Sequence, residues 1–324
     1  MEVLVLKLPG KARARTLLCV QRIAYFGPAG TFTEAALVQM EAAGTVRDTV
    51  ERIPAASPPA ALDLVRNGHA EMACVPIESS VEGPVVPTLD ALARGERLQI
   101  IAETELAIAF TVAARPGTSL EDVRTIAAYP VAAAQVSSWL SDNLGHARIV
   151  PAASNAAAAD DVAANRADAA ISTLLAARQR SLQILADEVA DVEGARTSFV
   201  LVTKPGPPPP RTGRDRTSIV LGLPNEPGAL AKAMNEFALR GIDLSRIQSR
   251  PTRTGMGTYR FYLDCIGHID DSAVGEALKA LRRGGGEVRF LGSWPTVVSG
   301  GCPPPDDTAV SAWLERLRRG DRTL

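Results

Sequence analysis

The sequence predicts an α/β protein in two parts, on three observations. Predicted strands and helices alternate before about residue 205, a pattern typical of α/β layers with a largely parallel sheet. Four consecutive prolines then stand in KPGPPPPRTGRDR, residues 204–216, where neither a helix nor a central strand can continue. After the prolines the elements follow in the order strand, helix, strand, strand, helix, strand, which is the ferredoxin-like plan. A chain of 324 residues is long enough for two domains of this kind.

The large region begins with a well-marked strand and helix. Residues 22–26 are a short apolar run, and GPAG at 27–30 forms a tight turn after it. The helix expected at 31–43 starts with Thr31 and Glu34, which have the spacing of a capping box. The other elements expected here are helices at 59–68 and 132–145, strands at 70–78, 106–114 and 196–203, and a strand that leads into a helix at 167–180.

The small region contains six elements. The strands are expected at 216–223, 242–250, 257–265 and 287–294, and the helices at 227–241 and 271–284. The first helix has an apolar stripe of Leu230, Ala233, Met234 and Phe237, which predicts core packing, and Gly241 is a suitable stop. A further helix expected at 308–320 is either a docking helix or a frayed tail.

Composition and charge exclude several classes of function. The net charge is −1, so nothing indicates a nucleic-acid partner. The three histidines lie alone, which argues against a metal site, and no apolar run is long enough to span a bilayer. The four cysteines are far apart and form no CxxC, which favours reduced thiols in a cytoplasmic protein. Residues 1–21 do not fit a secretory signal, and a disordered extension, a misplaced start codon and a targeting role stay open.

Polar groups follow three of the predicted strands or begin them. The GPAG turn opens directly onto a helix N-terminus, whose free N–H groups suit a carboxylate or phosphate, although an ordinary turn has the same sequence. Glu78, Ser79 and Ser80 end the second strand, where they either bind a polar ligand or cap the next helix. Thr197 and Ser198 stand at the mouth of the last strand of the large region, where they either start the strand or touch a substrate.

These stretches, in this order, resemble the prephenate dehydratase family. The motifs are YFGPAGTFTEAAL at 25–37, VPIESSVEGPVVPTLDAL at 75–92 and a Thr-x-Phe strand start at 197–199. The small domain is similar to the ACT domain that follows in that family, since GAL at 228–230 and QSRP at 248–251 match its effector motifs. The resemblance covers roughly residues 22–296, and the ordered set is highly specific although each motif alone is weak.

The resemblance implies a two-lobed, periplasmic-binding-protein-like catalytic domain followed by a ferredoxin-like ACT domain. It implies a carbon–oxygen lyase that converts prephenate to phenylpyruvate, water and carbon dioxide in L-phenylalanine biosynthesis, with no cofactor or metal. It also implies feedback inhibition by L-phenylalanine bound at ACT dimer interfaces, and hence a homodimer or homotetramer. The expected boundaries are an extension at 1–21, the catalytic domain at 22–204, a proline-rich linker at 205–216, the ACT domain at 217–296 and a tail at 297–324.

The same resemblance implies the site residues. Thr197 is the hydroxyl-bearing catalytic residue, since a hydroxyl at a strand mouth can donate a hydrogen bond to a departing ring hydroxyl. The expected substrate-binding residues are Gly27, Ala29, Gly30, Thr31, Glu78, Ser79, Ser80, Gln135, Arg196, Ser198 and Phe199. The expected effector-binding residues are Gly228, Ala229, Leu230, Gln248, Ser249, Arg250 and Pro251.

Several positions depart from the family's motifs. Ser198 replaces the arginine of Thr-Arg-Phe, and Arg196, on the same face of the strand, is a candidate substitute or a solvated edge charge. Ser79 replaces the asparagine of PIENS and keeps only one hydrogen-bonding group. In AYPVAAAQV, at 128–136, the Ser, His and first Gln of the family's SHPQALAQC are Ala128, Tyr129 and Val131. In QSRP, Gln248 stands where the family has a glutamate.

Three functions therefore compete. The first is a working prephenate dehydratase with a divergent pocket, which we favour because Thr197, Phe199, Gln135 and the 27–31 turn persist. The second is a prephenate decarboxylase-like enzyme of a specialised pathway that forms a non-aromatic product. The third is a non-catalytic paralogue that senses an amino acid through its ACT domain.

Overall fold

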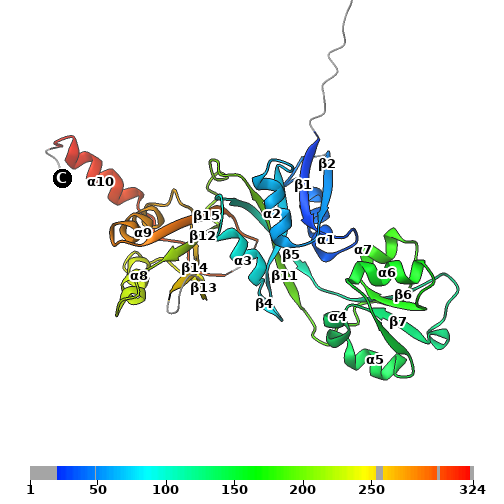
Figure 1. The fold of residues 1–324 in the computed structure, drawn as a ribbon. Helices are drawn as coiled ribbons and strands as arrows, with labels where there is room; N and C mark the ends of the chain where they lie inside the picture. Colours follow the sequence, from blue (N-terminus) through cyan, green and yellow to red (C-terminus); the bar gives the residue numbers. More distant parts are fainter. Residues whose placement is uncertain (1–19, 48, 253–257, 298–299, 322–324) are drawn as a thin grey trace, which may run out of the picture.

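The computed structural model describes residues 20–47, 49–252, 258–297 and 300–321. The strands of these residues form three sheets, and the first sheet organises the N-terminal lobe (Figure 1). Its strand order is β2-β1-β3-β11-β5, and β4 pairs with β3. The strands are β1 (Gln21–Phe26), β2 (Val50–Ala55), β3 (Met72–Ser79), β4 (Gly83–Pro84), β5 (Gln99–Ala107) and β11 (Arg196–Thr203). The helices of this lobe are α1 (Phe32–Ala42), α2 (Pro58–Arg66) and α3 (Val86–Leu92).

The second sheet organises the other lobe, with strand order β10-β6-β9-β7-β8. The strands are β6 (Thr111–Ala114), β7 (Thr125–Ala128), β8 (Arg148–Pro151), β9 (Ala169–Ser172) and β10 (Gln183–Ala186). The helices are α4 (Pro130–Gln135), α5 (Ser137–Leu144), α6 (Asn155–Ala163) and α7 (Leu174–Gln179), with a 3₁₀ turn at Leu120–Asp122. The chain enters this lobe after β5 and returns along β11, so two neighbouring strands of the first sheet carry both connections (Figure 1).

The third sheet belongs to the C-terminal domain and has the order β13-β14-β12-β15. Its elements are β12 (Asp215–Gly222), α8 (Ala229–Ala238), β13 (Leu244–Pro251), β14 (Tyr259–Ile266), α9 (Ser272–Arg283) and β15 (Glu287–Pro295). This is the predicted βαββαβ order. The predicted fold class is therefore confirmed: two α/β lobes are followed by a ferredoxin-like domain.

Three local predictions for the large region are wrong. Its sheets are mixed and not largely parallel, because β11 runs antiparallel to β3 and β5, and β6 runs antiparallel to β9 and β10. The single strand expected at 106–114 is two strands in different sheets, since an apolar run does not reveal where the chain changes lobes. The helix expected at 132–145 is interrupted at Val136, where φ is −127° and ψ is 20°.

The C-terminal domain packs against the first lobe through the sheet face that its helices leave uncovered. Val220, Tyr262 and Trp294 share one core cluster with residues of α3 such as Leu89. The Tyr262 hydroxyl donates to the Leu89 carbonyl at 3.1 Å. At Gly292 of β15 the backbone of β5 is so close that an added Cβ would stand 2.2 Å from a carbonyl oxygen. The first lobe thus lies between the other two parts (Figure 1).

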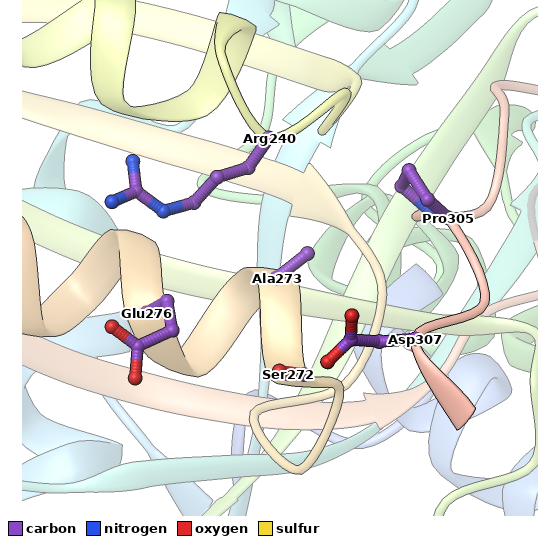
Figure 2. A pocket seen from close by; sticks show the side chains of 6 residues that line it. All are labelled: Arg240, Ser272, Ala273, Glu276, Pro305 and Asp307. Carbon is purple, nitrogen blue, oxygen red and sulfur yellow. The ribbon is translucent and has the colours of Figure 1, made fainter. Parts of the chain in front are cut away.

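The tail crosses the helical side of the C-terminal domain before its own helix begins. Pro305 and Asp307 border a shallow cavity with Arg240 and the first turn of α9, as Figure 2 shows. Beyond them α10 (Thr308–Arg318) forms as expected, but none of its residues is buried. No helix among the described ranges is long and apolar enough to cross a membrane. The expected extension at 1–21 lies almost wholly outside the described residues.

Candidate active site between the two lobes

A cavity of about 330 Å³ lies where the two lobes meet. Both lobes supply its walls, so it depends on the crossing strands that hold the lobes together. From the first lobe it is lined by Phe26, Gly27, Thr31, Phe32, Thr33, Pro76, Ser79, Glu82, Val85, Thr197 and Phe199. From the connection and the second lobe it is lined by Ile108, Phe110, Tyr129, Val131, Ala132, Gln135, Ala153, Ser154 and Asn155.

The N-terminus of α1 opens into this cavity. The Thr31 hydroxyl donates to the Phe26 carbonyl at 3.0 Å and accepts from the Glu34 N–H at 3.4 Å. The Thr31–Thr33 segment lines the cavity, and the N–H groups of a first helical turn have no acceptor within the helix. The positive end of α1 is therefore available to an anion.

The rest of the predicted turn serves the contact between lobes. The Gly30 N–H donates to the Glu34 carboxylate at 2.6 Å, and the Gly30 carbonyl accepts from the Thr173 hydroxyl of the second lobe at 2.5 Å. The Ala29 carbonyl accepts from Arg180 at 3.4 Å. Gly30 has φ of +90°, and a Cβ there would stand 2.7 Å from that of Ala176. Ala29 and Gly30 thus shape the turn without lining the cavity.

A second helix N-terminus reaches the cavity from the opposite lobe. The Ser154 hydroxyl accepts from the Ala157 N–H at 3.0 Å and caps α6. Asn155 follows it, and its buried Oδ1 has no hydrogen-bond partner among the described residues. Sequence reasoning missed these residues, although a serine after a strand and before an alanine-rich run is an N-cap signal.

Thr197 and Phe199 line the cavity from β11, and alternation along the strand turns Ser198 to the other face. Thr197 pairs with Ser79 of β3, and a bulge after Ser198 then brings Phe199 opposite Pro76. All four of these paired residues line the cavity. Within the described ranges, no group hydrogen-bonds the Thr197 hydroxyl. That hydroxyl is consequently available to a ligand.

The other hydroxyls at this strand end are already engaged. Ser79 Oγ accepts from the N–H groups of Val81 and Glu82, each at 3.3 Å. Ser80 Oγ accepts from the Arg196 N–H at 2.9 Å, and Ser80 does not line the cavity. Ser79 and Ser80 therefore hold the loop and the strand pair.

The face of the sheet that points away from the cavity carries three predicted substrate-binding residues, which are Glu78, Arg196 and Ser198. Ser198 is paired with Glu78 on one side and with Glu105 on the other. The Arg196 guanidinium lies 3.7 Å from the Glu105 carboxylate, and its side chain is 58% exposed. Arg196 thus neutralises a neighbouring carboxylate and does not act as a substitute cation inside the cavity.

The cavity has apolar walls and little charge. Phe32 and Phe110 meet edge to face across the lobes, with ring centroids 5.6 Å apart and planes at 80°. Tyr129 and Val131, which replace polar residues of the family's motif, line the second lobe's side. None of the described lining residues is Lys or Arg, and Glu82 is held by the Gln135 amide at 3.2 Å. Anion binding here depends on helix ends.

A second, smaller cavity of about 120 Å³ lies beside the N-terminus of α8. It is lined by Leu223, Pro224, Asn225, Glu226, Ala229, Leu230, Tyr259 and Phe261. Gly228 is the N-cap of α8 with φ of 78°, a left-handed conformation that favours glycine. The structure therefore places Ala229 and Leu230, but not Gly228, in the wall of this cavity.

The QSRP motif is divided between the two faces of β13. Ser249 is paired with Phe261 and Pro251 with Tyr259, both of which line the small cavity, and paired residues share a face. Gln248 and Arg250 point to the opposite face. There the Arg250 guanidinium binds the Asp90 carboxylate of α3 at 2.9 Å.

No group of three or more His, Cys, Asp or Glu side chains in the described ranges is arranged to hold a metal ion. In the first lobe, the groups with strongly shifted pKa values, Tyr25 and Cys74, do not line the cavity. Burial raises the pKa of Tyr25 to about 12, and the neighbouring Glu34 carboxylate adds to the shift. Burial likewise raises the pKa of the Cys74 thiol to about 12. These groups stay protonated at neutral pH and are part of the core.

Comparison with known proteins relates both parts of the chain to known families. The family model described as prephenate dehydratase matches residues 23–207, and the ACT domain model matches residues 217–283. A prephenate dehydratase of Mycolicibacterium gilvum is 59% identical over 304 residues, which are 92% of this chain and 98% of the relative. The prephenate dehydratase of Mycobacterium tuberculosis H37Rv is 58% identical over 303 residues, 92% of this chain and 94% of the relative.

Two solved structures are similar over most of the chain. The prephenate dehydratase of Arthrobacter aurescens in complex with L-Phe has a TM-score of 0.82 and 41% identity, and the match covers 92% of this chain and all of that one. GqqA, described as a novel type of quorum quenching acylase, has a TM-score of 0.74 and 27% identity, over 85% of this chain and 98% of that one.

Proposed function

This chain belongs to the prephenate dehydratase family, and we propose that it converts prephenate to phenylpyruvate, water and carbon dioxide in the cavity between its lobes. The observation that carries the assignment of the site is the Thr197 hydroxyl, which lines the cavity without a hydrogen-bond partner among the described residues. The product feeds L-phenylalanine biosynthesis.

The two helix N-termini suit a substrate with two carboxylates. Prephenate carries one carboxylate on the ring and one on its side chain. The first turn of α1 reaches the cavity from one lobe and the first turn of α6 from the other. Each end presents free N–H groups and the positive pole of the helix. We infer that each holds one carboxylate, so the lack of a lysine or arginine among the described lining residues does not prevent binding.

The proposed chemistry needs a donor at the ring hydroxyl and little else. The bond from the ring to its carboxylate breaks, carbon dioxide leaves, and the electron pair enters the ring as the C–OH bond breaks. The hydroxyl oxygen leaves with the bonding electron pair and takes up one proton from the solvent pool, so that one proton is consumed and water is released. The Thr197 hydroxyl donates a hydrogen bond to the departing oxygen, an effect worth about 3–4 kcal/mol per donor in hydrolases. Phe32, Phe110 and Phe199 exclude water from the leaving carboxylate.

L-Phenylalanine is the proposed effector, bound in the small cavity beside α8. The Leu230 N–H belongs to the first turn of α8 and suits the carboxylate of an amino acid, while Tyr259 and Phe261 offer an aromatic wall. The edge strand β13 has one neighbour, β14, in the described sheet, so its other edge can pair with a second copy. A homodimer or homotetramer is the assembly we infer, and the free thiols of Cys74 and Cys265 support a cytoplasmic location.

A decarboxylase-like reaction is the second candidate. Tyr129 and Val131 make the second lobe's wall more apolar than the family's motif does, and a drier wall favours loss of carbon dioxide over loss of hydroxide. In that case the electron pair left by carbon dioxide takes a proton from solvent onto a ring carbon, the ring hydroxyl stays on the product, and no aromatic ring forms.

Identification of the product tests the proposal. Purified protein is incubated with prephenate, and phenylpyruvate is detected by the absorbance of its aromatic enolate in base. The expected result is phenylpyruvate from the wild type and a large loss of it from Thr197→Ala. A non-aromatic product would support the decarboxylase instead, and binding of phenylalanine without turnover would support the non-catalytic sensor.

A further inference from the structure

The two faces of β13 have different neighbours: one is shared with wall residues of the small cavity, and the other meets the first lobe. A bulge between Leu244 and Arg246 shifts the register with β14. Beyond it, Ser249 and Pro251 share the face of the small cavity's wall, where they are paired with Phe261 and Tyr259. Arg246, Gln248 and Arg250 alternate with them and face the first lobe.

Arg246 connects the core of the C-terminal domain to the strand end at the interlobe cavity. Its guanidinium lies 2.9 Å from the buried Asp264 carboxylate and 3.7 Å from the Glu78 carboxylate of β3. The Arg246 side chain is only 9% exposed and Asp264 is buried, so solvent screens their contact weakly, whereas the Glu78 side chain is 45% exposed and its contact is screened more strongly. Glu78 immediately precedes Ser79, which lines the cavity and is paired with Thr197. A displacement of Arg246 therefore acts one residue away from Ser79, the cross-strand neighbour of Thr197.

Arg250 makes the matching contact at α3. It binds Asp90 through two nitrogens, at 2.9 and 3.4 Å, and both side chains are largely buried. The helix α3 begins after Val85, which lines the interlobe cavity. Its Thr88 hydroxyl donates at 2.7 Å to the carbonyl of Pro76, another lining residue. Arg250 is thus connected to the same wall by a second route.

Gln248 stands between the two arginines on this face. Its buried Oε1 has no hydrogen-bond partner among the described residues. An unpartnered buried acceptor disfavours the arrangement that leaves it so, and favours any small shift of β13 that pairs it. A shifted position of β13 in which the Gln248 Oε1 accepts a hydrogen bond is therefore favoured by this group.

We propose that Arg246 and Arg250 are positioning residues through which an occupant of the small cavity changes the interlobe cavity. The inference rests on the proposed function, in which L-phenylalanine is that occupant. When phenylalanine packs against Tyr259 and Phe261, β13 shifts with them, and its two arginines carry Glu78 and Asp90 along. The wall that holds Ser79 and Val85 then moves relative to Thr197.

The test uses Asp90→Asn and Glu78→Gln in the full-length protein. Each substitution nearly preserves shape and removes the charge that meets an arginine, and neither residue lines either cavity. The measurement is the fraction of prephenate turnover that survives saturating L-phenylalanine. We expect this fraction to rise at least about fivefold over the wild type, the lower end of typical couplings between sites. Phenylalanine is expected to raise the melting temperature of both variants and of the wild type alike.

Arg289→Met is the matched control. Arg289 also reaches the end of α3, where it donates to the Leu92 carbonyl at 2.9 Å, but it lies on β15 and not on β13. The Arg289→Met substitution is expected to lower the melting temperature. It is expected to leave the fraction of turnover that survives phenylalanine at the wild-type value. Three results would each overturn the proposed coupling while leaving the effector assignment intact. The fraction of turnover that survives phenylalanine could stay at the wild-type value in both test variants, or it could rise equally in Arg289→Met. The third such result is loss of phenylalanine binding in Asp90→Asn. Failure of phenylalanine to bind the wild type would overturn the effector assignment and the coupling together.

Discussion

Thr197 and Ser79 face each other across the β11–β3 pair, and of the two hydroxyls only that of Ser79 has hydrogen-bond partners among the described residues. Ser79 Oγ accepts two backbone N–H groups at 3.3 Å, whereas the Thr197 hydroxyl has no partner among the described residues. Two similar hydroxyls at one strand end are therefore distinguished by their neighbours. One holds a loop, and the other is left for a ligand.

An acidic side chain at the start of α6 is expected to reduce turnover without unfolding the protein. Asn155→Asp adds a negative charge where we infer that a substrate carboxylate lies. Like charges in close contact cost several kcal/mol, and even ~2 kcal/mol lowers kcat/KM about 30-fold. Asp is favourable at a helix N-terminus, so the melting temperature is expected to stay level or rise. Steady-state kinetics with Asn155→Ala as a neutral control checks this, and equal losses in the two variants would refute the carboxylate site.

An arginine at position 198 is expected to stabilise the first lobe. Ser198 is paired with both Glu78 and Glu105, so a cation there would share two carboxylates with Arg246 and Arg196, which lie 3.7 Å from them. Such cross-strand pairs contribute roughly 0.2–1 kcal/mol each. Urea unfolding of Ser198→Arg should give an increase of this order, and Ser198→Gln, of similar length but neutral, should give none. An equal gain from glutamine would show that packing and not charge is responsible.

Phenylalanine is expected to raise the melting temperature. A ligand present at 100 times its Kd adds about 2.7 kcal/mol to the free energy of unfolding. Thermal unfolding with millimolar L-phenylalanine measures the shift, and D-phenylalanine is the control because, with its carboxylate and ring placed as in the L form, its ammonium group points in another direction. No shift with the L form would contradict the effector assignment.

The buried thiols are expected to be inert in the native state. Burial raises the pKa of Cys74 from 9.0 to about 12, so at pH 8 its thiol stays protonated, while Cys302 is exposed. Maleimide labelling followed by peptide mass spectrometry should modify Cys302 and spare Cys74 until urea is added. Because the folded pKa is the higher one, the stability from this group is complete well below pH 9 and falls as the pH rises toward 12. Equally rapid labelling of both cysteines in the native protein would contradict this.

The fold class followed from the sequence because alternation and turn signals are local. The Thr31 N-cap and the βαββαβ order can be identified without knowing any long-range contact, although the capping box is only half formed, because the Glu34 carboxylate accepts from the Gly30 N–H. The direction of β11 could not be predicted in this way. Its pairing with β3 and β5 depends on how the chain returns from the second lobe, and a strand's own residues do not reveal its direction.

The site was predicted in part, for the same physical reason. Period-two alternation correctly separates Thr197 from Ser198, because it is a property of the strand itself. Sequence reasoning did not foresee that Arg250 reaches Asp90, since a motif gives residue order and not the side of the sheet that meets another domain. It also missed Asn155, whose importance appears only when α6 is brought opposite α1. The effector role of the QSRP motif stays a prediction.

The central claim is that the Thr197 hydroxyl donates to the departing oxygen. The most direct test compares kcat for prephenate in the variants Thr197→Val and Thr197→Ser. Valine keeps the shape of threonine and replaces the hydroxyl by a methyl group, whereas serine keeps the hydroxyl. The account predicts that kcat falls about 10²–10³-fold in the valine variant, as expected for loss of one transition-state donor, and stays within about tenfold in the serine variant. A valine variant that turns over prephenate at the wild-type rate would contradict it.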